Sequence, residues 1–167
     1  MSSPTRAVRT AVALFGAYVV SQAYIAALLR PLGRDVLRVQ TTGDPDEFCR
    51  IMTGWSPEQR LQYRKHLLPD TLHPLLYASA LAAAGIAGHE PSTPRWVRIV
   101  AVAAPAASAV CDLSENALHA RFVNHPHRVT REAARASTLL TRTKWVLACG
   151  TAGALITRTL RKRRSAR

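Results

Sequence analysis

The chain has 167 residues, of which 48% are hydrophobic and only 6% aromatic, and its net charge is +13. This length predicts one domain. So strong a positive charge would point to nucleic acid in a soluble protein, but here the basic residues flank long apolar segments, as they do beside anionic lipid headgroups. The composition therefore favours an integral membrane protein, and we expect no nucleic-acid partner.

Residues 10–29 form the clearest predicted membrane span. This stretch is uncharged and lies between Arg9 and Arg30, and at 1.5 Å per residue its helix matches the ~30 Å hydrocarbon core of a bilayer. A positive start followed by an apolar run also occurs in signal peptides, but this run is long and lacks a small-residue cleavage site. We therefore expect an uncleaved helix.

Residues 44–70 are expected to form a helical hairpin between the first and second spans. A capping residue followed by a first-turn proline occurs twice, at Asp44 and at Ser56, which predicts two helix starts. Aromatic residues alternate here with arginine and lysine, a composition typical of the membrane interface. We expect the hairpin to lie on the headgroup layer, and the aromatic residues on which this expectation rests are Phe48, Trp55 and Tyr63.

Three further spans are predicted, at residues 71–88, 99–120 and 136–157. The first of them is uncharged, and its second half is rich in alanine and glycine, which suits close helix packing. The other two contain charged residues, so each is plausible as a span only if it packs against the other. The sequence therefore predicts an all-α fold, a bundle of four transmembrane helices within a single domain over residues 1–157.

Residues 158–167 contain six lysines and arginines, and we expect a disordered tail or one bound to anionic lipid. With four spans both termini share one side of the membrane. The two sides carry nearly equal numbers of basic residues, but this tail is the densest basic cluster beside a span, which favours cytoplasmic termini. We expect the plasma membrane of a bacterium as the location.

The third span carries its polar residues on one helical stripe. Asp112, Glu115 and His119 stand at positions i, i+3 and i+7, so they face the same side of a helix. The fourth span follows in an antiparallel hairpin and brings Arg142 and Lys144 to matching depths. An ionised carboxylate in hydrocarbon is costly unless it is paired. We therefore expect Asp112 and Glu115 to pair with Arg142 and Lys144 and to fix the two helices together.

A metal site is a weaker alternative. A second stripe of polar residues begins the second span, and together with the third span it offers carboxylate and imidazole ligands for one or two ions. Such residues more often serve as caps or interface groups, and no histidine-box spacing is present. We therefore expect no metal or other cofactor; the residues of this alternative are His66, Asp70, His73, Asp112, Glu115 and His119.

Proton transfer is a further alternative. A desolvated carboxyl group and a nearby imidazole can exchange protons near neutral pH, which suits acid and base chemistry on a lipidic substrate or a proton relay in a small carrier. The catalytic candidates on this interpretation are Asp112, Glu115 and His73.

Two segments resemble a pattern of small multi-span bacterial membrane proteins. GWSPEQRLQYRKHLLPDTLHPLLY (residues 54–77) contains a YxxxxLLD-like helix leading into a PLLY span, and PAASAVCDLSEN (residues 105–116) contains a DxxEN element. The resemblance implies a four-helix topology and brings no assigned activity.

We therefore expect a small integral membrane protein whose buried charges fix helix pairing, or alternatively a membrane enzyme or carrier that acts by proton transfer. The lipid bilayer, its anionic headgroups, another membrane protein and a second copy of this chain are the expected partners. The three cysteines, Cys49, Cys111 and Cys149, have no CxxC spacing and predict neither a disulfide framework nor a zinc ribbon.

Overall fold

The computed structural model describes residues 3–90 and 92–165, and these residues form helices, turns and short connections without a strand. Seven α-helices and two short 3₁₀ helices follow one another along these described residues. They are α1 (Ser3–Leu29), η1 (Arg30–Leu32), α2 (Asp35–Thr41), α3 (Pro45–Gly54), α4 (Pro57–Leu67), α5 (Pro69–Gly88), α6 (Arg95–Phe122), η2 (Pro126–Arg128) and α7 (Arg131–Ser165).

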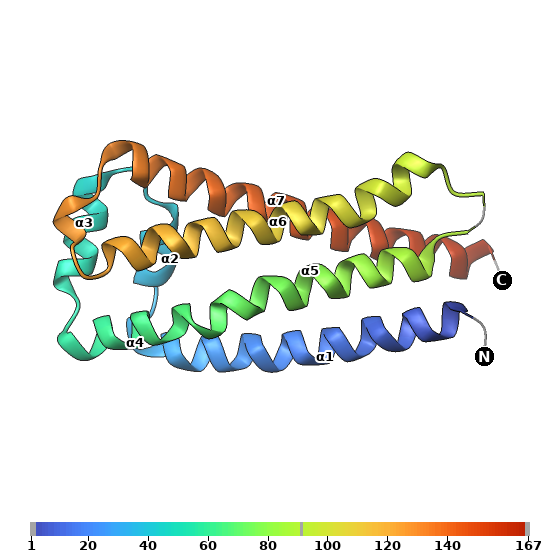
Figure 1. The fold of residues 1–167 in the computed structure, drawn as a ribbon, viewed down its shortest axis with the longest axis horizontal. Helices are drawn as coiled ribbons and strands as arrows, with labels where there is room; N and C mark the ends of the chain where they lie inside the picture. Colours follow the sequence, from blue (N-terminus) through green and yellow to red (C-terminus); the bar gives the residue numbers. More distant parts are fainter. Residues whose placement is uncertain (1–2, 91, 166–167) are drawn as a thin grey trace.

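The four long helices lie side by side and alternate in direction (Figure 1). α1 packs along α5, α5 along α6 and α6 along α7, whereas α1 makes no extensive contact with α6 or α7. Both ends of the described chain lie at one end of the molecule together with the loop between α5 and α6. The short helices α2, α3 and α4 gather at the opposite end, which we call the head.

Three of the long helices are apolar and long enough to cross a membrane. The qualifying segments are Arg6–Leu32, Pro69–Gly88 and Arg95–Phe122. They contain the first three spans expected from the sequence. The fourth expected span, 136–157, lies within α7 but is not among these segments. The uncharged stretch between Lys144 and Arg158 is about 20 Å long, less than the ~30 Å of a hydrocarbon core.

Large apolar side chains cover the outside of the long helices. Val20 of α1 is 71% exposed, Trp96 of α6 is 68% exposed and Val146 of α7 is 72% exposed. Apolar residues that face outward on three separate helices form more hydrophobic surface than a water-soluble protein normally presents. Membrane association follows from this surface and from the three apolar helices.

The head helices begin at the capping residues that the sequence indicated. The Asp44 side chain accepts a hydrogen bond from the Asp46 N–H at 3.1 Å. At the next helix, Ser56 Oγ accepts from the Gln59 N–H at 3.2 Å, and the Gln59 side chain accepts from the Ser56 N–H at 2.9 Å. This reciprocal capping box satisfies two backbone donors at the start of α4.

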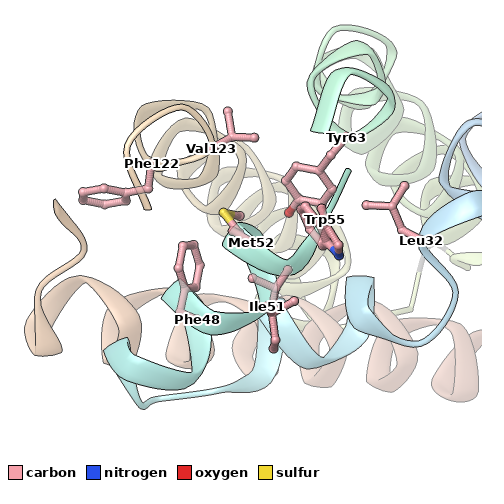
Figure 2. Packing of buried hydrophobic residues seen from close by; sticks show 9 residues of the cluster. Leu32, Phe48, Ile51, Met52, Trp55, Tyr63, Phe122 and Val123 are labelled. Carbon is pink, nitrogen blue, oxygen red and sulfur yellow. The ribbon is translucent and has the colours of Figure 1, made fainter. Parts of the chain in front are cut away.

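The head has its own hydrophobic core (Figure 2). Residues of α3 and α4 pack against the end of α6 and against Leu32 and Val39. The rings of Phe48, Trp55 and Tyr63 are buried in this core and not exposed on the surface of the head. Each residue removes more apolar area from water in a packed core than at an interface.

The basic end of the chain continues α7 as far as Ser165. The sequence predicts that residues 158–167 are disordered or bound to anionic lipid; residues 158–165 are helical, and residues 166–167 lie outside the described part. Two contacts tie this helix end to the loop between α5 and α6. Lys162 Nζ lies 2.7 Å from Glu90 Oε1, and Arg158 donates a hydrogen bond to Thr93 Oγ1 at 3.2 Å.

Small residues allow α5 and α6 to approach closely. A Cβ atom added at Gly85 would lie only 3.1 Å from Ala101 Cβ, a contact that glycine alone relieves without a shift of the helices. The glycines of α7 behave differently, since an added Cβ at Gly150 or Gly153 meets no atom within 4 Å. The small-residue face of α7 is thus open in the single chain.

Candidate functional site

A buried ion triad joins α6 to α7. Lys144 Nζ lies 2.7 Å from Asp112 Oδ1 and 2.7 Å from Glu115 Oε2. The two acids stand almost one turn apart on α6, and the antiparallel course of α7 brings the lysine level with both. Glu115 is fully buried, and Asp112 and Lys144 are nearly so.

Arg142 does not take part in the triad. Its side chain is exposed, and no ion pair found among residues 3–90 and 92–165 includes it. Two residues along an α-helix correspond to a rotation of about 200°, so Arg142 and Lys144 face opposite sides of α7. One base therefore serves both acids, where the sequence indicated two.

Hydroxyl groups extend the polar site toward α5. Ser108 Oγ donates a hydrogen bond to the backbone carbonyl of Lys144 at 2.8 Å. Tyr77 Oη lies 2.9 Å from the same Ser108 oxygen. Because the Ser108 proton is already used, Tyr77 is the donor in this contact. The chain of hydroxyls thus links α5, α6 and α7 beside the triad.

His73 and Asp70 occupy the same end of α5 without pairing with the lysine. His73 Nδ1 lies 3.1 Å from Ser21 Oγ of α1, and the Tyr18 ring packs on the imidazole at 5.1 Å between centroids. The backbone carbonyl of Asp70 accepts a hydrogen bond from Asn116 at 3.0 Å. The structure therefore places His73 between α1 and α5, with its Nδ1 turned to α1.

A second polar chain crosses the junction between the head and the long helices. His119 contacts the Tyr63 hydroxyl through Nδ1 and lies 2.8 Å from Ser137 Oγ through Nε2. Burial, followed by the nearby Glu115 and Asp70 carboxyl groups, raises the pKa of Tyr63 well above its ordinary value. The phenol therefore keeps its proton, and both nitrogens of His119 have partners.

His66 is a buried neutral base in the head. Its Nδ1 contacts the backbone carbonyl of Tyr63, and since a carbonyl can only accept, Nδ1 carries the proton. Burial lowers the pKa of His66 to about 4. The Nε2 atom is consequently an unprotonated nitrogen at neutral pH.

The side chains considered for a metal site are engaged in separate contacts. No group of three or more His, Cys, Asp and Glu residues suited to a metal ion occurs in the described part of the chain. His66 binds a backbone carbonyl, His73 faces a serine, and His119 lies between a tyrosine and a serine. These three histidines therefore do not share one site in the described part of the chain.

Sequence reasoning missed the hydroxyl residues that complete the polar site. Ser137, Thr141 and Lys144 stand at positions i, i+4 and i+7 of α7, the same periodicity that singled out the acidic stripe of α6. That spacing would have separated Lys144 from Arg142. Tyr63 gave no such signal, because an aromatic residue between basic ones also fits a membrane interface.

The arrangement can hold a buried charge, orient hydroxyl groups around it and bind a proton. These capacities follow from three ionisable side chains in contact within an apolar helix layer. Comparison with protein-family models, with curated proteins and with solved structures finds no match to this chain.

Proposed function

We propose that this chain is a small integral membrane protein with four membrane-crossing helices, in which the triad of Asp112, Glu115 and Lys144 locks α6 against α7. The observation that supports this most directly is the pair of 2.7 Å contacts that Lys144 makes with the two acids. Buried charges are expensive in hydrocarbon and gain their compensation from one another. Separating α6 from α7 would leave these charges uncompensated in hydrocarbon, so the triad stabilises the contact between the two helices.

The fourth crossing is supported by the surroundings of α7. This helix packs along α6 and exposes Trp145 and Val146 on its outer side. Arg142 and Arg158 flank the apolar stretch, and their long side chains can extend toward the two headgroup layers while the stems remain in hydrocarbon. The apolar segment of α7 can cross the membrane despite its short length, because Asp112 and Glu115 of α6 neutralise Lys144.

The proposal places the head on one side of a bacterial plasma membrane and both termini on the other, in the cytoplasm. The supporting feature is the basic end of α7, together with Arg95 and Arg98 at the start of α6, because such clusters near anionic headgroups usually face the cytoplasm. Reporter fusions to the C-terminus and to the loop between α3 and α4 test this topology. A C-terminal reporter active only outside the cytoplasm would contradict the orientation.

The lock is tested by the thermal stability of the purified full chain in detergent. Lys144→Met strands two buried acids and should lower the melting temperature strongly, whereas Arg142→Gln removes an exposed cation on the same helix and should change it little. Equal effects of the two substitutions would contradict the proposed lock.

A second candidate function is a membrane enzyme or carrier that moves protons on a small lipidic substrate. The observation that favours it is the excess of acids over bases in the triad, with His73 within electrostatic range of Asp112. In this role Asp112 and Glu115 would exchange the proton and His73 would relay it.

Proteoliposomes with an enclosed pH dye test the carrier form of this candidate. Proton flux in the wild type that disappears in Asp112→Asn and His73→Gln, at unchanged thermal stability, would support it. Flux equal to that of empty liposomes would remove the carrier and leave the structural lock.

A further inference from the structure

The triad has more negative than positive groups. Asp112 and Glu115 share the single cation Lys144, and Arg142 is exposed on the far side of α7. His66 is neutral because burial keeps its pKa near 4, and His127 and Arg128 of η2 are exposed. The remaining titratable groups near Glu115 on the elements packed against α6 are Asp70, His73 and Tyr77 of α5 and Tyr63 of α4, with His119 on α6 itself.

None of these neighbours forms an ion pair with Asp112 or Glu115 in the described part of the chain. His73 directs Nδ1 toward Ser21 of α1, and His119 is held between Tyr63 and Ser137. Asp70 adds a further carboxyl group at the start of α5, where the helix dipole favours it. If both triad acids were ionised, one buried negative charge would have no counterpart.

We propose that the triad binds one exchangeable proton at neutral pH and that Glu115 carries it. The bound proton turns the triad into one carboxylate, one ammonium group and one neutral acid, so that its charges cancel. This proton-binding site goes beyond the proposed helix lock, because pairing alone fixes no proton content.

Hydrogen bonding distinguishes the two acids. Asp112 accepts a hydrogen bond from Lys144 at 2.7 Å. Glu115 is completely buried, and Lys144 approaches its Oε2 at 2.7 Å in poorer hydrogen-bond alignment than it approaches Asp112. A fully buried carboxylate that is poorly aligned with its donor is the less stable anion of the two, whereas a carboxylic acid needs only one acceptor.

Thr141 provides an acceptor. Its hydroxyl lies beside the Glu115 carboxyl group, and its own proton is directed to the backbone carbonyls of Gln40 and Ser137, each at 3.0 Å. With that proton committed, the Thr141 oxygen can only accept from Glu115. The local hydroxyl geometry therefore favours Glu115 as the neutral acid.

Infrared difference spectroscopy on the full chain in lipid nanodiscs tests the site. The wild type at neutral pH should show the C=O stretching band of a protonated carboxyl group, and that band should disappear in Glu115→Gln. Gln has the shape of the neutral acid, so the melting temperature of this variant should stay close to that of the wild type. Glu132→Gln, a change at an exposed glutamate of the same protein, should leave the band intact.

Two further variants keep the proposal falsifiable. Lys144→Met removes the cation and should increase the band, because Asp112 then also takes up a proton. A band that keeps its frequency in Glu115→Asp, a variant that also leaves two acids beside Lys144, would overturn the assignment to Glu115. A wild-type protein without such a band at neutral pH would overturn the proton site itself, while the stability test of the helix lock would still stand on its own.

Discussion

Lys144 of α7 reaches within 2.7 Å of Asp112 on α6, and both side chains are buried. Asp112 and Lys144 lie on the two helices of one antiparallel hairpin, so their contact depends directly on how α6 packs against α7. It also explains how a helix with two basic residues near the middle of its predicted span can lie in an apolar layer. One of the two is neutralised, and the other faces outward.

The coupling between these two residues is the first prediction. Lys144→Met should destabilise the protein by about 3 kcal/mol, within the range found when one partner of a buried ion pair is removed, whereas Asp112→Asn should cost less because Glu115 remains beside Lys144. The double variant should recover a large part of the loss. Thermal stability in detergent, read as a double-mutant cycle, should give a coupling energy well above the ~0.5 kcal/mol of independent sites.

The same cycle with Arg142 is the matched control. Asp112→Asn combined with Arg142→Gln should be additive within about 0.5 kcal/mol, because no contact joins the two side chains. Strong coupling here and none with Lys144 would mean that α7 is rotated about its axis relative to the described structure.

The sequence was sufficient for the long helices and for the starts of the head helices. Long uncharged runs located α1 and α5, and capping residues located α3 and α4, since both signals depend on neighbouring residues alone. The acidic stripe of α6 was also visible, because helical periodicity places Asp112 and Glu115 on one face. These features need no knowledge of tertiary packing.

The remaining features depend on tertiary contacts. Depth along the chain matched both Arg142 and Lys144 to the acids, but only the rotation of α7 decides which of them faces α6. Phe48 and Trp55 fit a membrane interface as well as a protein core. The short helix α2, which the sequence patterns did not predict, contributes Val39 to the core of the head. Such choices are made by packing rather than by local propensity.

Close packing of α5 on α6 gives the second prediction. Gly85→Leu should destabilise the protein by roughly 1 to 3 kcal/mol, because even the first carbon of the new side chain would press on Ala101 at 3.1 Å. Gly150→Leu on the open face of α7 should be neutral or slightly stabilising, since leucine is the better helix former. Melting temperatures in detergent compare the two, and a larger loss at Gly150 would show that this face is covered by another chain.

The hydrogen bond between Tyr63 and His119 gives the third prediction. Tyr63→Phe keeps the ring in the head core but leaves His119 Nδ1 without its partner, which should cost about 1 to 3 kcal/mol. Tyr24→Phe, at an exposed tyrosine of α1, should change the melting temperature little. Equal losses in the two variants would indicate that the tyrosine hydroxyl carries no structural role in the head.

The neutral state of His66 gives the last prediction, a pH dependence of stability. Burial lowers the pKa of His66 to about 4, whereas in the unfolded chain it returns to about 6.5. Between these values the unfolded chain binds a proton that the folded protein does not, so stability is complete above pH 6.5 and falls as the pH drops toward 4. The full difference corresponds to at most about 3 kcal/mol.

His66→Gln, which keeps a polar side chain but cannot titrate, should flatten this part of the stability curve, while His127→Gln at an exposed histidine of η2 should leave it unchanged. Melting temperatures measured across this pH range distinguish the variants. If all three proteins lose stability in parallel, the acid sensitivity lies elsewhere, and the triad of Asp112, Glu115 and Lys144 becomes the group to examine.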